Sequence, residues 1–164
     1  MKYFDNVVDY NDKAFIYEFC QNSNFKLGWY DSEEYNKLST PSLFSHWSLE
    51  DLKNSKLYSH IQKIQDLSRF ERAILNLTKP GDVHYIHTHN QHDVILYYVN
   101  LEWKDGWYGE TVFYDKDAKE ITDTVTYTPG RVVLFDGKQP HAIRPQSIIG
   151  PQIRFTISIF LKKY

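Results

Sequence analysis

The chain has 164 residues, enough for one domain with a full hydrophobic core and too few for two ordinary domains. Its formal net charge is −2 and its basic residues are dispersed, so we expect neither a nucleic-acid partner nor binding to a membrane surface. Cys20 is the only cysteine, which excludes an internal disulfide and a cysteine-based zinc site and favours a reducing, cytoplasmic location. Polar residues interrupt every apolar run near the N-terminus, so we expect no signal peptide or spanning helix.

Helical signals are confined to residues 1–69, which we expect to form a mostly helical support. Asn11 is a candidate N-cap for a first helix over "DKAFIYEFC". Ser48 and Asp51 resemble a capping box, with aspartate in place of the usual glutamate. Apolar residues then repeat at helical spacing at Leu57, Ile61 and Ile64. The pattern predicts a second helix through "LKNSKLYSHIQKIQ".

Strand signals replace helical ones in residues 70–164. Short segments rich in β-branched and aromatic residues are separated by Gly- and Pro-containing turns. They are "FERAILNL", "VHYIHTH", "VILYYVN", "TVFYD", "DTVTY", "RVVLF", "HAIR" and "IRFTISIFL". Helices followed by about eight strands predict a mainly β domain in which helices pack on a β-sandwich or barrel.

Histidines cluster in the second of these segments. In a strand, residues two apart point to the same face, so His87 and His89 could chelate one ion together. A third ligand must come from elsewhere, and His141, between a turn and a short strand, is the best candidate. His84 and His92 should point away from such a site. Imidazoles suit Fe(II), Zn(II), Ni(II) or Cu(II), although histidines also occur in strands without any metal.

The last predicted strand has two different faces. Apolar side chains alternate along it at Ile153, Phe155, Ile157, Ile159 and Leu161, and the opposite face carries Arg154, Thr156 and Ser158. If this strand is central, Arg154 points into an enclosed space, where a guanidinium can hold a carboxylate or phosphate in a bidentate fork. A structural salt bridge with an internal carboxylate is the alternative.

Four segments together resemble the Fe(II)- and 2-oxoglutarate-dependent oxygenases, in particular their prolyl 4-hydroxylase-like branch. They are "HTH", "LYYVNLEWKDGWYGETVFYD", "YTPGRVVLFDGKQPHAIRP" and "RFTIS", in the order and at the spacing of that family. The resemblance covers about residues 73–162. It implies a double-stranded β-helix, or jelly roll, that binds Fe(II), uses 2-oxoglutarate as cosubstrate, and hydroxylates an unactivated C–H bond of an amino acid, a peptidyl proline or a small metabolite.

The resemblance also implies roles for individual residues. His87 falls on the first histidine of the family's H-x-D motif and His141 on its distal histidine. Arg154 matches the basic residue that pairs with the far carboxylate of 2-oxoglutarate. Tyr98 matches a tyrosine whose hydroxyl reaches the same carboxylate. Thr156, beside Arg154, is a weaker candidate for contacting that carboxylate.

The sequence departs from the family at His89, which stands where the family has aspartate. The metal site could contain three histidines, or Asp93 or a water could complete it beside His87 and His141, or the oxygenase reaction could be lost. We favour three histidines because the geometry of His87 and His89 is local. Asp93 would lie about 20 Å from His87 along an unbroken strand and could coordinate only if the chain turns.

A cupin-like site is the alternative. "GDVHYIHTHNQHD" fits the first cupin signature with Asp93 in place of glutamate, which would make His87, His89, Asp93 and His141 the ligands. A thiol dioxygenase, an isomerase or a non-catalytic metal- or ligand-binding protein would then follow. The second cupin motif fails in its spacing, and this alternative leaves Arg154 unexplained.

Five further side chains receive smaller roles. Tyr85 could line the cosubstrate pocket, and Glu110 in "YGET", at the family's "GGET" segment, could support the substrate or fix a turn. Trp103 and Trp107 are candidate wall residues. Arg144 is a candidate contact for an anionic substrate.

Overall fold

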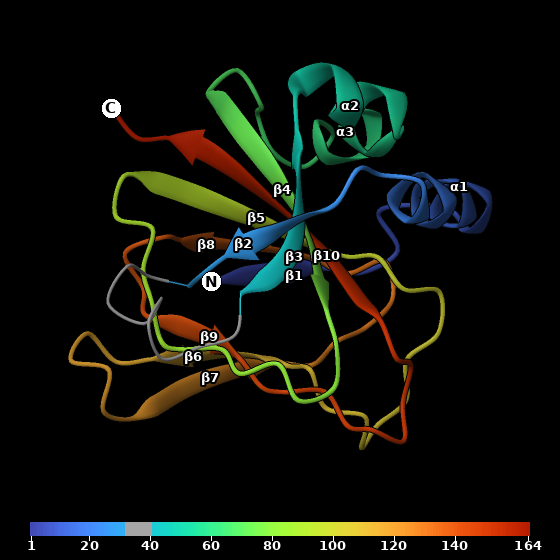
Figure 1. Cartoon of the computed structure of the whole chain (residues 1–164). Coiled ribbons are helices and arrows are strands. Elements are labelled where there is room, and N and C mark those ends of the chain that lie inside the picture. The colour runs from blue at the N-terminus through green and yellow to red at the C-terminus, as the bar shows by residue number, and fades with distance from the viewer. Residues whose placement is uncertain (32–40) are drawn as a thin grey trace.

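The computed structural model describes residues 1–31 and 41–164, and this part of the chain forms two facing β-sheets with helices on one side (Figure 1). The elements in chain order are β1 (Lys2–Phe4), α1 (Tyr10–Gln21), β2 (Lys26–Trp29), β3 (Ser42–Trp47), α2 (Leu49–Asn54), α3 (Leu57–Ile61), β4 (Phe70–Thr78), β5 (His92–Tyr98), β6 (Thr111–Tyr114), β7 (Ile121–Val125), β8 (Val132–Asp136), β9 (His141–Ile143) and β10 (Arg154–Lys162). None of the helices in the described ranges is long and apolar enough to cross a membrane.

The two sheets have the topology of a double-stranded β-helix. The larger sheet has the strand order β1-β8-β5-β10-β4-β3-β2, and the smaller sheet has the order β7-β6-β9. Every strand pair is antiparallel. The predicted fold class, mainly β with a jelly-roll core, is therefore confirmed.

The larger sheet has a separate apolar cluster on each face. Its outer face packs against the helices, in a cluster that includes Ile16, Leu52, Leu57, Ile157 and Ile159. Its inner face, turned toward the smaller sheet, forms a second cluster that includes Ile74, Val94, Leu96, Phe113 and Phe160. The central strand β10 contributes to both clusters because its side chains alternate, as its sequence pattern predicts. One face of the sheet thus builds the helical interface and the other lines the interior.

The helices differ from their predicted forms in two ways. The N-cap of α1 is Asp9, whose carboxylate accepts the N–H of Asp12 at 2.9 Å, and not Asn11 as expected. The capping box of Ser48 and Asp51 at α2 is confirmed. The helix after it is broken, however, because Lys56 adopts a left-handed conformation (φ 68°) and separates α2 from α3.

Residues 1–69 are less helical than predicted. This region also supplies β1, β2 and β3, which extend the larger sheet at both of its edges. The segment "SLFSHW" of β3 pairs with β4 in register from Leu43 opposite Leu77 to Trp47 opposite Ala73. The apolar side chains of this short strand find a partner in the sheet, so tertiary contacts decide its conformation. Residues 32–40 of the region lie outside the described residues.

Candidate metal centre

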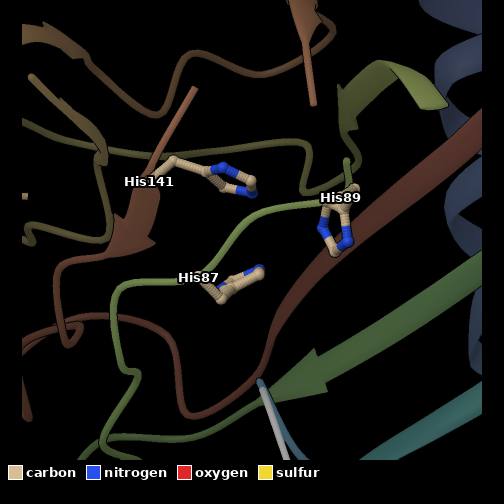
Figure 2. Close-up of side chains that lie close together, drawn as sticks. All are labelled: His87, His89 and His141. Atoms are coloured by element: carbon tan, nitrogen blue, oxygen red, sulfur yellow. The ribbon is translucent and has the colours of Figure 1, made fainter. Parts of the chain in front are cut away.

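Three histidines meet in the space between the two sheets. His87 and His89 come from the segment between β4 and β5, and His141 is the first residue of β9 (Figure 2). One ring nitrogen from each residue lies within 4.8 Å of the others. The ring centroids are 4.4 Å apart for His87 and His141, 4.9 Å for His87 and His89, and 5.1 Å for His89 and His141. The structure therefore brings together the three residues that the sequence selected.

The backbone that holds these histidines is not the strand predicted over "VHYIHTH". The segment leaves β4, passes beside the smaller sheet and returns to β5 (Figure 1). It makes a single isolated β-bridge, in which the backbone N–H of His87 donates to the carbonyl of His141 and the N–H of His141 donates to the carbonyl of His87, each at 3.0 Å. The N–H of His89 donates to the carbonyl of Gly137. The histidines are thus placed by contacts with β9 and with the loop before it, and not by the alternation of a strand.

Hydrogen bonds to the ring nitrogens fix the tautomers of two histidines. Nδ1 of His87 lies 2.9 Å from the carbonyl oxygen of Tyr85, and Nδ1 of His141 lies 2.9 Å from that of Gln139. A carbonyl oxygen only accepts, so in each ring Nδ1 carries the proton and donates it. Nε2 of both rings is left with its lone pair, which is the arrangement found in metal-ligating histidines.

Burial keeps the three imidazoles neutral. It is the largest cause that lowers the pKa of each ring, and the positive charge that a protonated His87 would carry is the next largest for the other two. The pKa falls to about 2 for His89 and about 3 for His141, and it is also lowered for His87. Because a metal binds only the neutral imidazole, these rings are in the ligating form at neutral pH.

A carboxylate that the sequence analysis missed lies beside the histidines. Asp31 follows β2, and its Oδ1 is 4.0 Å from Nδ1 of His87 and 3.6 Å from Nδ1 of His84. Its Oδ2 accepts the backbone N–H of Tyr85 at 2.7 Å. Burial is the largest influence and would raise the pKa of Asp31, but the nearby imidazoles of His84 and His87 and the N–H of Tyr85 lower it overall.

Of the two histidines expected to point away from the site, one does and one does not. The side chain of His84 is buried and lines the same cavity as the three clustered histidines, so its predicted orientation is wrong. The prediction assumed a regular strand, and this segment is not one. His92 does lie elsewhere, with its Nε2 3.1 Å from Oε2 of Glu71.

Asp93 does not belong to the histidine cluster. It lies on β5, where its carboxylate is 3.1 Å from Nη1 of Arg69 and 3.6 Å from Nζ of Lys163. The group of side chains that could hold a metal contains the three histidines without it. The alternative in which Asp93 is a ligand is therefore wrong, and so is the alternative four-ligand cupin set. Side chains alternate along β5, so Val94 points into the interior and its neighbour Asp93 points to the opposite face of the sheet.

Arg154 is fully buried at the start of β10. Its Nε donates to the carbonyl of Gly109 at 3.1 Å, and its guanidinium carbon lies 4.8 Å from the ring centroid of Tyr127 and 5.7 Å from that of Tyr98. Nη1 and Nη2 have no hydrogen-bond partner within the described residues. No carboxylate of the described residues lies within ion-pair distance of this guanidinium, although the charge of Glu110 acts on the pKa of Arg154 from further away. A buried cation with two free donors is costly unless an anion neutralises it, so this site is suited to an anionic ligand.

Tyr98 and Thr156, the two other residues predicted to contact a cosubstrate, lie near Arg154. The hydroxyl of Tyr98 shares a hydrogen bond of 2.7 Å with Oγ1 of Thr111, and its ring stacks on Tyr127 with centroids 4.5 Å apart. Oγ1 of Thr156 is buried without a partner among the described residues, and Thr156 lines the cavity that contains the three histidines. Tyr127 was missed, since a tyrosine in a strand-like segment is most often a core residue.

The smaller roles assigned to other residues receive mixed support from the geometry. The ring centroid of Trp103 lies 4.3 Å from that of Tyr127 and 5.9 Å from that of Trp107. Trp103 therefore packs against the tyrosine whose ring contacts the guanidinium of Arg154. Oε2 of Glu110 is buried without a hydrogen-bond partner in the described ranges, and its Oε1 lies 4.0 Å from Nη1 of Arg144. The Arg144 side chain is half exposed, so it is accessible from solvent.

Comparison with known proteins identifies the fold but no family. No family model matches the chain, and no curated protein matches it. Among solved structures, a Pseudomonas putida prolyl-4-hydroxylase superposes with a TM-score of 0.69 at 14% identity, over 99% of this chain and 92% of that one. An oxidoreductase of the 2OG-Fe(II) oxygenase family from Burkholderia pseudomallei gives 0.70 at 10% identity, over 99% and 85%.

A third similar structure is a prolyl hydroxylase from Trichoplax adhaerens, solved with a peptide fragment of the hypoxia-inducible factor oxygen degradation domain. It gives a TM-score of 0.64 at 14% identity, over 98% of this chain and 82% of that one. At such low identities the likeness establishes the fold, a double-stranded β-helix of the type found in 2-oxoglutarate-dependent oxygenases. The activity has to be argued from the site itself.

Proposed function

We propose that this protein is an Fe(II)- and 2-oxoglutarate-dependent dioxygenase with a three-histidine metal site. The buried guanidinium of Arg154, with two terminal nitrogens that find no partner among the described residues, is the observation that carries the proposal. Arg154 lies on the same face of β10 as Thr156, Ser158 and Phe160, which line the cavity of the three histidines. The cavity contains the candidate metal site, and the guanidinium of Arg154 lies beyond Thr156 on the same face of the strand. This order suits a ligand such as 2-oxoglutarate, which has a metal-chelating end and a distant carboxylate.

The residues present fit a metal ion. His87, His89 and His141 offer three neutral imidazole nitrogens within 4.8 Å of one another, and this is a ligand set that suits Fe(II). These three residues would hold the metal. Arg154, Tyr98 and Thr156 would bind the far carboxylate of 2-oxoglutarate through the guanidinium and two hydroxyl groups.

The chain itself contributes orientation and exclusion of water. Bound Fe(II) would supply the activation of dioxygen, which no side chain can perform. The carbonyls of Tyr85 and Gln139 keep Nε2 of two histidines available, and the apolar side chains of Val94, Leu96 and Phe135 keep the cavity poor in water. The product would be a hydroxylated amino acid, peptidyl proline or small metabolite, in line with the prolyl hydroxylases among the similar structures.

A titration with 2-oxoglutarate tests the proposal. Protein loaded with Fe(II) under anaerobic conditions is titrated with 2-oxoglutarate, and the visible charge-transfer band of a bidentate complex is followed. We expect a saturable band whose apparent Kd rises at least 100-fold in Arg154→Ala, because a buried charge-assisted contact is lost. Lys116→Ala removes an exposed cation to which no role in the site is assigned and should leave the Kd unchanged.

The outcomes separate the competing functions. A band that forms equally well in Arg154→Ala would contradict the assignment of the anion site. Stoichiometric iron binding without any band would reject 2-oxoglutarate and favour the three-histidine dioxygenase or isomerase of the cupin type. Loss of iron binding in His89→Ala, with retention in Asp93→Asn, is expected if three histidines form the site.

A further inference from the structure

Asp31 contacts two parts of the segment that carries His87. Its Oδ2 accepts the N–H of Tyr85 at 2.7 Å, and the carbonyl of that same residue accepts the proton of Nδ1 of His87 at 2.9 Å. Its Oδ1 lies 4.0 Å from the same Nδ1 and 3.6 Å from Nδ1 of His84. The carboxylate is therefore linked to the candidate metal ligand through one residue, Tyr85, and is also close to its ring.

The charge of Asp31 is enclosed with the histidines. Its side chain is 12% exposed, and among the described residues that line the cavity it is the only carboxylate. An attraction between charges decreases only with the inverse of distance, and burial reduces its screening by water. A carboxylate at this position would therefore still attract a divalent cation held by His87, His89 and His141, although it is not within reach to be one of the ligands.

An H-x-H pair lacks a charge that an H-x-D pair has. Three imidazoles leave a divalent ion with its full charge of two units, whereas two imidazoles and one carboxylate neutralise one unit. Asp31 comes from a part of the chain about 55 residues before the histidines, and it places one negative charge beside them. The negative charge that is missing at position 89, where a histidine stands in place of aspartate, is thus present nearby at Asp31. The H-x-H motif alone does not reveal it.

From this geometry we infer that Asp31 is a positioning residue of the metal centre, which supplies from outside the ligand set the negative charge that His89 does not provide and which orients His87 through Tyr85. This inference rests on the metal binding in the proposed function. It concerns residues of this chain that lie outside the H-x-H pair and the distal histidine.

The contribution of Asp31 can be measured as a change in metal affinity, which requires no enzymatic turnover. Apoprotein is titrated with Co(II) or Zn(II) in competition with a chromophoric chelator, for the wild type, Asp31→Asn and Asp31→Glu. Asp31→Asn keeps an acceptor for the N–H of Tyr85 and removes the charge, so we expect the affinity to fall 10- to 100-fold. Asp31→Glu keeps the charge and should recover the affinity to within a few-fold. Asp93→Asn, which removes a carboxylate outside the cluster, should bind as the wild type does.

The visible spectrum of bound Co(II) provides a second readout. If Asp31 is outside the ligand set, the position and intensity of the cobalt bands should be the same in Asp31→Asn as in the wild type. A changed spectrum would show that Asp31 coordinates the metal directly, and equal affinities would show that its charge has no role. Either result overturns the inference while leaving the metal site in place. A wild-type protein that binds no metal would instead overturn the proposed function, and the inference with it.

Discussion

At the scale of single residues, the position of His89 depends on a neighbour without a side chain. A Cβ atom at Gly137 would lie 2.4 Å from the carbonyl oxygen of His89 and 2.6 Å from that of His92. Both oxygens belong to backbone that is hydrogen-bonded in place, because the carbonyl of Gly137 accepts from His89 and its N–H donates to the carbonyl of His92. The turn before β9 can approach the candidate metal ligands this closely only with glycine.

Gly137→Ala should therefore affect both stability and metal binding. We expect a loss of about 1–3 kcal/mol in the free energy of unfolding from overpacking, together with weaker Co(II) affinity because His89 is displaced. Urea denaturation and a chelator competition titration measure the two effects. The neighbouring Lys138→Ala removes an exposed side chain and should change stability by less than about 0.5 kcal/mol. Unchanged values in Gly137→Ala would mean that this turn relaxes freely.

The histidines could be selected from the sequence, whereas their surroundings could not. Residue type and the spacing of His87, His89 and the distant His141 were sufficient to choose the cluster. The assumed strand was wrong, however, and so was the orientation of His84 derived from it. Asp31 carries no local signal at all, because its contact with Tyr85 depends on how β2 is placed in the sheet, and sequence periodicity contains no information about that.

At the scale of elements, β1 is a three-residue edge strand that pairs with β8 and is held by an ion pair next to it. Nε and Nη2 of Arg131, which precedes β8, donate to the two carboxylate oxygens of Asp5 at 2.7 Å and 2.9 Å. The hydrogen bond from Arg131 is the largest cause that lowers the pKa of Asp5 below its ordinary value of 3.8. An aspartate whose pKa is lowered in the folded state stabilises that state while it is ionised.

This contribution has a defined pH dependence. It is fully present above the ordinary carboxyl value of 3.8 and is lost as the pH falls through the lower pKa of the folded state. Asp5→Asn should be less stable than the wild type by about 1 kcal/mol or less near pH 7, and the two should converge in acid. Urea denaturation at several pH values measures the difference. Asp117→Asn, in the exposed loop between β6 and β7, is the control, and a difference for Asp5→Asn that persists in acid would contradict the ion-pair explanation.

Elements with strong periodicity were predicted best. The two faces of β10 were assigned correctly from alternation alone, apart from Ile153, which precedes the strand and is exposed. The capping box of Ser48 and Asp51 correctly located the start of α2. The break between α2 and α3 was missed because Lys56 is a residue that rarely adopts positive φ. The ion pair of Lys56 with Asp12, at 2.8 Å, is a tertiary contact that appears only once α1 has packed nearby.

At the scale of the whole molecule, the candidate metal centre joins distant parts of the fold. His87 and His89 belong to the connection from β4 to β5 of the larger sheet, and His141 belongs to β9 of the smaller sheet. An ion bound to all three would link the two sheets. Because the unfolded chain does not hold the three rings together, such an ion would bind the folded state preferentially and stabilise it.

Metal removal should accordingly lower the thermal stability. At a free metal concentration 100 times the Kd, binding contributes about 2.7 kcal/mol, and a domain of this size shifts by about 2–4 °C per kcal/mol, so we expect a rise in Tm of about 5–10 °C. Differential scanning fluorimetry with Co(II) and with EDTA measures the shift. His89→Ala should lose most of it, whereas Asp93→Asn should keep it. An equal shift in both variants would place the ion somewhere other than the histidine cluster.

The alternation of β10 also constrains how this protein can change in evolution. Inserting or deleting one residue within the strand would exchange its faces, moving the guanidinium of Arg154 toward the helices and the ring of Phe155 into the cavity. Changes in length are therefore confined to the connections between strands, where segments such as 99–110 can grow or shrink without shifting the register. New specificities in this fold would arise by replacing side chains on the strands and by remodelling the connections around an unchanged β10.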